Sequence, residues 1–141
     1  MPLLYEDLEI GQALPALTAG PLTHNQFVRY AGASGDFNPL HTDPAFARAA
    51  GLDGVIAHGM LVMGIAGRLL SDAFGPEALR RFGVRFKGMT RPGDTLTVTA
   101  LVKEKLEVAG EARVRGEIQA ADQSGEVKLA GVFEVAPRRR A

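Results

Sequence analysis

The segment "GASGDFNPLHTDPAF", residues 32–46, holds the residues of this sequence that are best suited to chemistry. Asp36, Asn38 and His41 fall within six positions, with prolines and glycines among them. Pro39 has a restricted backbone and favours an extended conformation at Asn38, so the chain between Asp36 and His41 is stiff. A carboxylate and an imidazole that converge on one water molecule can act as an acid/base pair. The spacing therefore predicts a site that activates water.

A purely structural interpretation of the same residues remains open. The side chains of Asp36 and Asn38 can cap turns, and His41 can be a hydrogen-bonded histidine at the edge of the core. Each residue alone favours this interpretation, whereas the set favours the functional one. In the functional interpretation, Asn38 fixes the tautomer of the imidazole or orients the water.

Composition limits the classes of partner and cofactor. The 141 residues predict one domain, 1–141, and the 16 basic residues balance the 16 acidic ones, which argues against nucleic acid or an anionic membrane as the main partner. The absence of cysteine excludes disulfides, thiolate nucleophiles and cysteine metal sites. His24, His41 and His58 are 17 residues apart, a spacing that predicts no metal site.

Two features predict a cytoplasmic protein without a membrane segment. The first residues, "MPLLYEDLEI", carry acidic side chains and lack the basic region of a signal peptide. The longest apolar run, residues 59–67, is shorter than the ~20 residues that a membrane-spanning helix needs.

Three helices are expected in the first half of the chain. Thr23 is a candidate N-cap for a helix over 24–32, and Asp43 with Pro44 begins a short helix that Gly51 ends. The third helix, over "MLVMGIAGRLLSDAFG", is apolar nearly all round and is expected to lie inside the protein. Its Gly64 and Gly67 predict close approach of another backbone.

After residue 80 the apolar residues alternate with period two, which is typical of strands. The expected strands and their turns are "VRFKG", "TLTVTALVKEKLEV", "ARVRGEIQA" and residues 127–135, separated by "RPGD", "VAGE" and "DQSG". Short turns predict an antiparallel meander curved around the third helix, an α+β arrangement. Such an open sheet leaves an edge unpaired, and pairing with a second copy predicts a homodimer.

Two stretches carry a family resemblance, "YAGASGDFNPLHTDPAFA" and "VIAHGMLVMG", within residues 30–67. They resemble the motif of MaoC-like (R)-specific enoyl-CoA hydratases and the related (R)-3-hydroxyacyl-thioester dehydratases. The resemblance implies a hot dog fold, an antiparallel sheet wrapped around a long central helix, normally dimeric. It implies a substrate carried on coenzyme A or acyl carrier protein, and no cofactor.

The resemblance also implies a role for each motif residue. Asp36 and His41 match the catalytic pair that adds water to a trans-2-enoyl thioester. Asn38 matches the asparagine that holds the hydrogen-bond geometry, and Gly59 matches the glycine whose N–H faces the thioester carbonyl. Some relatives place a serine further along the helix, but here no hydroxyl precedes Ser71, which leaves a second donor to the carbonyl unassigned.

Two other functions on the same fold stay open, a non-catalytic acyl-binding subunit and a thioesterase. The intact motif argues against the first, and the lack of a carboxylate between residues 54 and 71 argues against the second. Beside Gly59, His58 is interpreted as a buried turn residue, with a direct catalytic role as the alternative, and His24 is expected to be exposed. Arg85 and Lys87 are expected on an outer strand face. The C-terminal "PRRRA" is interpreted as a solvated tail, with contact to coenzyme A phosphates or an acidic carrier protein as the alternative.

Overall fold

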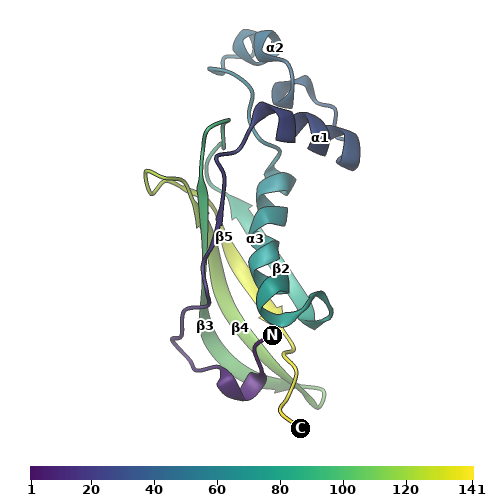
Figure 1. Ribbon diagram of the computed structural model, residues 1–141, viewed down its shortest axis with the longest axis vertical. Helices are drawn as coiled ribbons and strands as arrows, with labels where there is room; N and C mark the ends of the chain where they lie inside the picture. Colours follow the sequence, from purple (N-terminus) through teal and green to yellow (C-terminus); the bar gives the residue numbers. More distant parts are fainter.

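The computed structural model describes residues 1–141, and a five-stranded antiparallel sheet curves around one long helix (Figure 1). The helices are α1 (His24–Ser34), α2 (Pro44–Ala49) and α3 (Gly59–Phe74), with three short 3-10 turns, η1 (Tyr5–Asp7), η2 (Pro39–His41) and η3 (Pro76–Ala78). The strands are β1 (Leu17–Ala19), β2 (Leu79–Phe86), β3 (Leu96–Val108), β4 (Glu111–Ala121) and β5 (Val127–Val135). The predicted α+β arrangement is confirmed. Helices α1 and α2 lie together beyond the end at which α3 begins.

The strand order is β1-β3-β4-β5-β2, so only β3, β4 and β5 form a meander. The prediction that β2 and β3 are neighbours is wrong: β2 pairs with β5 at the opposite edge. Strand β2 also begins at Leu79, earlier than the apolar alternation indicates, because Arg80 and Arg81 interrupt that pattern and the register shifts between Leu79 and Arg81.

The core lies between the concave face of the sheet and one face of α3. That helix contributes five buried residues, Val62, Ala66, Leu69, Leu70 and Phe74. The alternating apolar residues expected on β3 and β4 point inward, and Val98, Val102 and Val114 are completely buried. Burial of this apolar surface is the main force that holds the sheet on the helix.

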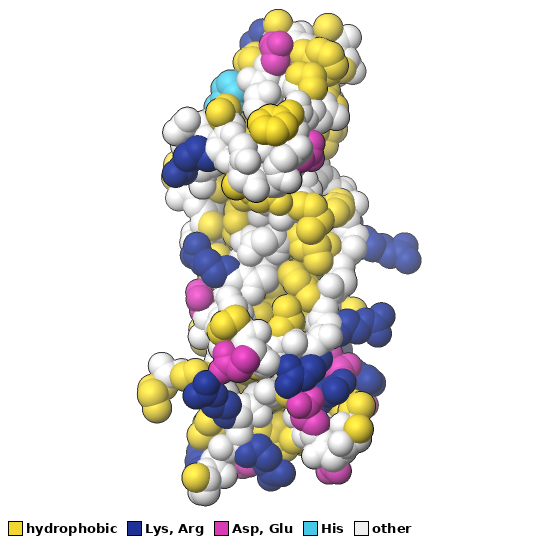
Figure 2. Space-filling view, turned by 90° about the vertical axis from the view of Figure 1, so that its right-hand side faces the viewer, with side chains coloured by type: hydrophobic (Ala, Val, Ile, Leu, Met, Phe, Trp, Pro, Cys, Tyr) yellow, Lys and Arg dark blue, Asp and Glu magenta, His cyan; other side chains and the backbone are white.

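The other face of α3 is uncovered in the single chain. Met60 is 58% exposed, and Gly64 and Arg68 are also exposed. Apolar side chains gather along the middle of this face, as Figure 2 shows. The prediction that α3 lies wholly inside is therefore wrong, because one sheet can cover only one side of a helix. No helix has the length and apolar character needed to cross a membrane.

Within the single chain, the glycines of α3 do not meet another backbone, so the predicted close approach does not occur there. A Cβ at Gly64 would meet nothing within 4 Å, and a Cβ at Gly67 would lie 3.0 Å from the ring of Phe82. Close backbone approach occurs in the sheet instead, where a Cβ at Gly131 would lie 2.0 Å from the Gly83 carbonyl oxygen. Glycine at this position therefore permits the close approach of β5 and β2.

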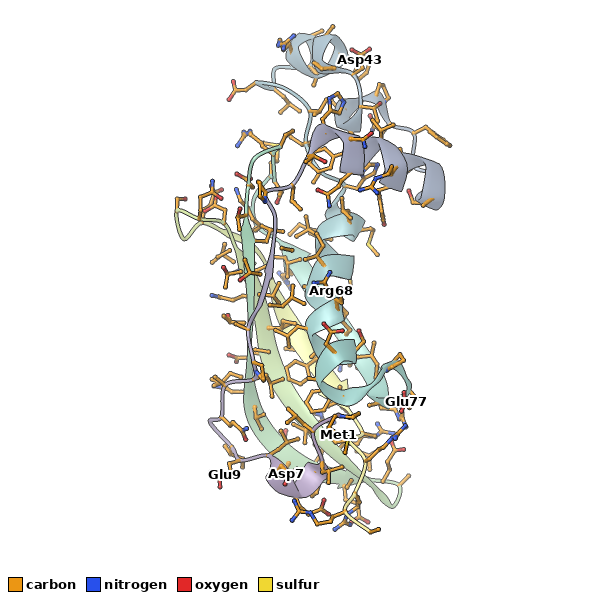
Figure 3. The ribbon with its side chains drawn as sticks, in the orientation of Figure 1. Met1, Asp7, Glu9, Asp43, Arg68 and Glu77 are labelled. Carbon is orange, nitrogen blue, oxygen red and sulfur yellow. The ribbon has the colours of Figure 1, made fainter.

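The C-terminal arginines are solvent-exposed, as the interpretation of a solvated tail predicts, but they also form ion pairs. Arg138, Arg139 and Arg140 pair with Glu77, Glu6 and Asp7, respectively. The carbonyl oxygen of Arg138 also accepts a hydrogen bond from the N–H of Tyr5. Asp7 and Glu77 mark this end of the molecule in Figure 3, and Figure 1 shows both termini at the same end. The side chains of the arginines stay mostly exposed, and such pairs contribute little to stability individually.

Candidate active site

Helix α1 ends immediately before the predicted site. Thr23 is its N-cap, as expected: Thr23 Oγ1 accepts from the N–H of Gln26, and the Gln26 side chain accepts from the N–H of Thr23. The helix extends two residues beyond the predicted end and stops at Gly35, whose φ of 77° is in the left-handed region. Glycine tolerates this conformation, which turns the chain immediately before Asp36.

Asn38 orders the loop between Asp36 and His41. Its N–H donates to Oδ1 of Asp36 at 3.2 Å, and its own Oδ1 accepts from the N–H of Leu40 at 3.1 Å. The second bond begins the turn η2, whose last residue is His41. Both Asp36 and Asn38 thus have the turn-capping role of the structural interpretation. Oδ2 of Asp36 takes no part in the turn and faces His41.

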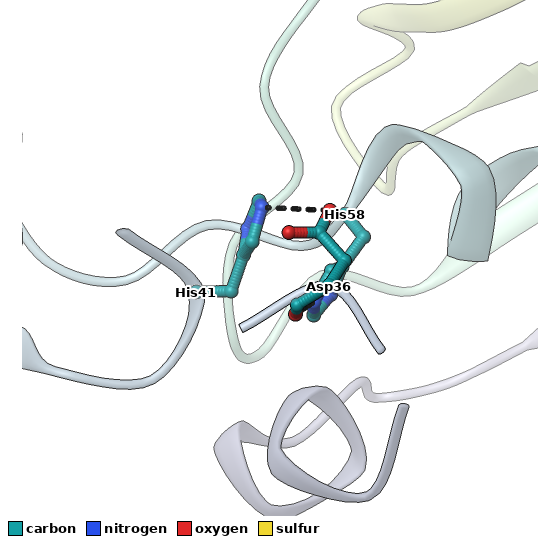
Figure 4. A group of neighbouring side chains, drawn as sticks. All are labelled: Asp36, His41 and His58. Atoms are coloured by element: carbon teal, nitrogen blue, oxygen red, sulfur yellow. Dashed lines mark hydrogen bonds and ion pairs between the residues drawn. The ribbon is translucent and has the colours of Figure 1, made fainter. Parts of the chain in front are cut away.

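The imidazole of His41 is held in one tautomer by the backbone. Its Nδ1 lies 2.8 Å from the carbonyl oxygen of Ile56, and since a carbonyl oxygen can only accept, Nδ1 carries the proton. In the neutral ring Nε2 then bears the lone pair. Nε2 lies 3.8 Å from Oδ2 of Asp36 (Figure 4), too far for a direct hydrogen bond. Ile56, and not Asn38, fixes the tautomer.

His58 supports both members of the pair. It is 1% exposed, its Nε2 donates to the backbone oxygen of Asp36 at 3.1 Å, and its ring stacks on that of His41 with centroids 3.8 Å apart. Tyr30 contacts the ring of His58 edge-on. Burial lowers the pKa of His58 below 6.5, with a smaller contribution in the same direction from the charge of His41. The interpretation of His58 as a buried residue is confirmed.

Histidine spacing in the sequence does not reflect proximity in space. Asp36, His41 and His58 place potential ligand atoms within 4.8 Å of one another. One nitrogen of each ring is already bonded to a backbone oxygen, and the ring planes are only 23° from parallel. Lone pairs lie in the ring plane, so the lone pairs of the two remaining nitrogens lie in nearly parallel planes and do not converge on one ion. His24 is half-buried and donates to the Thr42 carbonyl oxygen at 2.8 Å, so its predicted exposure is wrong.

A pocket of about 240 Å³ opens beside His41. Its lining combines apolar and polar residues from four segments of the chain: His41, Ile56, Ala57, Gly59, Val62, Phe86, Gly88, Met89, Thr90 and Lys128. Gly59 is the first residue of α3, and the N–H groups of Gly59 and Met60 have no acceptor within the chain. Free N–H groups at a helix N-terminus favour negative charge. The pocket therefore brings a base and an anion-stabilising element together.

The space beside Gly59 is filled by protein on one side. A Cβ at this position would lie 3.1 Å from the ring of Phe86. Glycine thus leaves room for the Phe86 ring against the start of α3, in addition to any approach of a substrate. The sequence motif does not identify four of the residues that line the pocket, because they belong to separate segments that no local pattern joins. These residues are Ile56, Phe86, Thr90 and Lys128.

Lys128 is a buried cation at the wall of this pocket. Its Nζ donates to the Met89 carbonyl oxygen at 2.8 Å and pairs with Asp122 at 3.2 Å and Glu126 at 3.1 Å. Desolvation opposes the charge, but the bonds to Glu126 and Asp122 outweigh it and raise the pKa of Lys128. Lys128 thereby ties the β2–β3 connection to the β4–β5 turn.

A larger groove of about 540 Å³ lies on the outer face of the sheet and includes Arg85, Lys87 and Glu117. Arg85 and Lys87 are exposed there, as predicted. The groove is on the face away from α3 and contains none of Asp36, His41 and Gly59. The smaller pocket is therefore the candidate active site.

The chain is similar to several known proteins. The family described as MaoC like domain matches residues 7–123. A peroxisomal hydratase-dehydrogenase-epimerase of Neurospora crassa is 43% identical over 58% of this chain, and the enoyl-CoA hydratase ChsH3 of Mycobacterium tuberculosis is 45% identical over 45% of it. These matches span only 9% and 23% of the relatives' own lengths. The structure of R-hydratase PhaJ1 from Pseudomonas aeruginosa superposes with a TM-score of 0.88 at 29% identity, over 99% of this chain and 88% of that one.

Proposed function

The chain belongs to the MaoC-like dehydratase family, and from this premise we propose that it catalyses (R)-specific hydration of trans-2-enoyl thioesters or the reverse dehydration. Its fold is the hot dog fold of the (R)-hydratase structures that it matches. The observation that carries the proposal is the separation of 3.8 Å between Oδ2 of Asp36 and Nε2 of His41, beside the free N–H groups of α3.

Asp36 and His41 activate a water molecule between them. Nε2 of His41 bears the lone pair that accepts a proton from the water while its oxygen bonds to C3 of the enoyl group. The C2–C3 double bond becomes a single bond, and the acid/base pair returns a proton to C2 from the same face. Dehydration is the same sequence in reverse, and neither direction needs a redox cofactor.

Gly59 stabilises the charge that develops on the thioester. Addition at C3 moves electron density onto the carbonyl oxygen, which becomes enolate-like. The free N–H of Gly59, at the positive end of the α3 dipole, donates to this oxygen. The apolar part of the pocket, including Val62 and Phe86, receives the acyl chain.

We extend the proposal to carrier and assembly. An enoyl-CoA hydratase among the relatives supports coenzyme A as the thioester carrier, with acyl carrier protein as the alternative. The uncovered apolar face of α3 and the unpaired edge of β2 support a homodimer.

Hydration of crotonyl-CoA, followed as loss of enoyl absorbance, tests the proposed reaction. Substitutions Asp36→Asn and His41→Ala are each expected to lower kcat/KM by about 10²-fold or more, since they remove general acid/base catalysis. Asp43→Asn is the matched control: Asp43 caps α2 in the same segment, its oxygen accepts from the N–H groups of Ala45 and Phe46, and asparagine also caps helices. This variant is expected to keep wild-type activity.

Three results would contradict the proposal. Release of free thiol without loss of the double bond would indicate a thioesterase. A folded protein that binds crotonyl-CoA without turnover would indicate an acyl-binding subunit. Full activity of both variants at Asp36 and His41 would remove these residues from the mechanism.

A further inference from the structure

Thr90 lines the pocket and carries a buried hydroxyl group without a partner. The residue is 2% exposed, and its Oγ1 is buried and makes no hydrogen bond within the protein. It lines the same pocket as His41 and Gly59. Buried hydroxyls are nearly always paired because an unpaired one is costly. An orphaned hydroxyl at a pocket wall indicates a group that a ligand completes.

The backbone around Thr90 is held on both sides. Its carbonyl oxygen accepts from the N–H of Ala57 at 2.7 Å, and the preceding carbonyl, that of Met89, accepts from Lys128 at 2.8 Å. Ala57 is two residues before Gly59, so Thr90 is tied directly to the segment that leads into α3. The position of the Thr90 backbone, next to the segment that leads into α3, is therefore built into the fold.

We infer, on the basis of the proposed function, that the Thr90 hydroxyl donates a hydrogen bond to the thioester carbonyl oxygen together with the N–H of Gly59. Helix α3 supplies no side-chain hydroxyl before Ser71, so a hydroxyl donor to this oxygen comes from another element. Thr90 is the hydroxyl residue that lines the pocket. Because the carbonyl oxygen gains charge as water adds, this bond strengthens in the transition state.

The test compares Thr90→Val, which keeps the shape and removes the hydroxyl, with Thr90→Ser, which keeps the hydroxyl. With crotonyl-CoA, Thr90→Val is expected to lower kcat by about 10²-fold, the usual cost of one lost donor to a developing oxyanion. Thr90→Ser is expected to retain most of the activity. The midpoint of thermal unfolding should not fall in Thr90→Val, because the variant removes an unpaired buried hydroxyl.

Wild-type kcat in Thr90→Val, an effect on KM alone, or a fall in kcat accompanied by a lower unfolding midpoint would overturn the inference. Calorimetric titration with butyryl-CoA, which has the same carbonyl but no double bond, separates this inference from the proposed function. Thr90→Val is expected to bind butyryl-CoA about tenfold more weakly than wild type. If the wild-type protein lacks hydratase activity but shows this loss, the proposed reaction fails and the Thr90 contact stands. Equal binding by both proteins overturns the contact.

Discussion

Single atoms of two histidines decide what the site can do. Nδ1 of His41 and Nε2 of His58 each donate to a backbone oxygen, those of Ile56 and Asp36. A backbone oxygen can only accept a hydrogen bond, so Nδ1 of His41 keeps its proton, and Nε2 of His41 is left as the proton acceptor. A charged His58 stacked 3.8 Å from His41 would oppose protonation of His41. Burial lowers the pKa of His58, which favours its neutral form and so preserves the base.

The lowered pKa of His58 predicts a pH-dependent stability. In the unfolded chain His58 takes up a proton near pH 6.5, whereas in the folded protein it does so only at lower pH. Protonation therefore favours the unfolded chain, and the free energy of unfolding falls as the pH drops below 6.5. The slope from this residue is at most about 1.4 kcal/mol per pH unit. Urea unfolding between about pH 7 and pH 5.5 measures it, a window above the carboxylate titrations.

His58→Asn is the matched variant for this measurement. Asparagine is uncharged at every pH and is accepted at the N-cap of a helix, the position that His58 has in α3. The variant is expected to show a flatter dependence on pH over the same range. Equal slopes for the two proteins would assign the dependence to groups other than His58.

At the scale of elements, glycine decides how closely β5 and β2 approach. Gly131 of β5 lies opposite Val84, and a Cβ there would be 2.0 Å from the Gly83 carbonyl oxygen and 2.7 Å from Cα of Val84. Both are backbone atoms, which cannot move without disturbing the sheet. By contrast, a Cβ added at Gly83, in the adjacent strand β2, would meet no atom within 4 Å.

Alanine at these two positions therefore has unequal effects. Gly131→Ala is expected to lower the free energy of unfolding by about 3 kcal/mol, the upper end for overpacking. Gly83→Ala is expected to be within about 0.5 kcal/mol of wild type, as for an unhindered site. Urea unfolding of the two variants measures the difference. If the costs are equal, steric contact at Gly131 is not what limits the sheet.

At the scale of the whole molecule, two surfaces lack a partner within the chain. One is the outer face of α3, where Met60 is 58% exposed, and the other is the edge strand β2, with Leu79 42% and Phe86 51% exposed. Phe86 also contacts the start of α3 at Gly59. A second copy that covered these surfaces would adjoin the pocket and add to its walls.

The proposed homodimer predicts a particle of twice the 15.0 kDa mass of one chain. Sedimentation equilibrium over a range of micromolar concentrations measures this mass. Burial of apolar surface is the expected driving force, so high salt should leave the dimer intact. A single-chain mass throughout, or dissociation by salt alone, would contradict an apolar interface.

The local pattern of the sequence determined the caps of α1 and α2, the inward faces of β3 and β4, and the segment that joins Asp36 to His41. These features depend on residues a few positions apart: Thr23 with Gln26, Asp43 with Phe46, and alternating apolar side chains. Hydrogen bonds of caps and the period of a strand are local, so a single sequence is sufficient to predict them.

Only the tertiary structure decided the place of β2, the tautomer of His41, and the presence of Thr90 in the pocket. His41 meets Ile56 and His58 after the chain has folded back on itself, and Lys128 reaches Met89 from a strand 39 residues away. Such contacts depend on which strands pair and how a helix packs on the sheet. No local period encodes them, because the free energy that selects them comes from burial across the whole core.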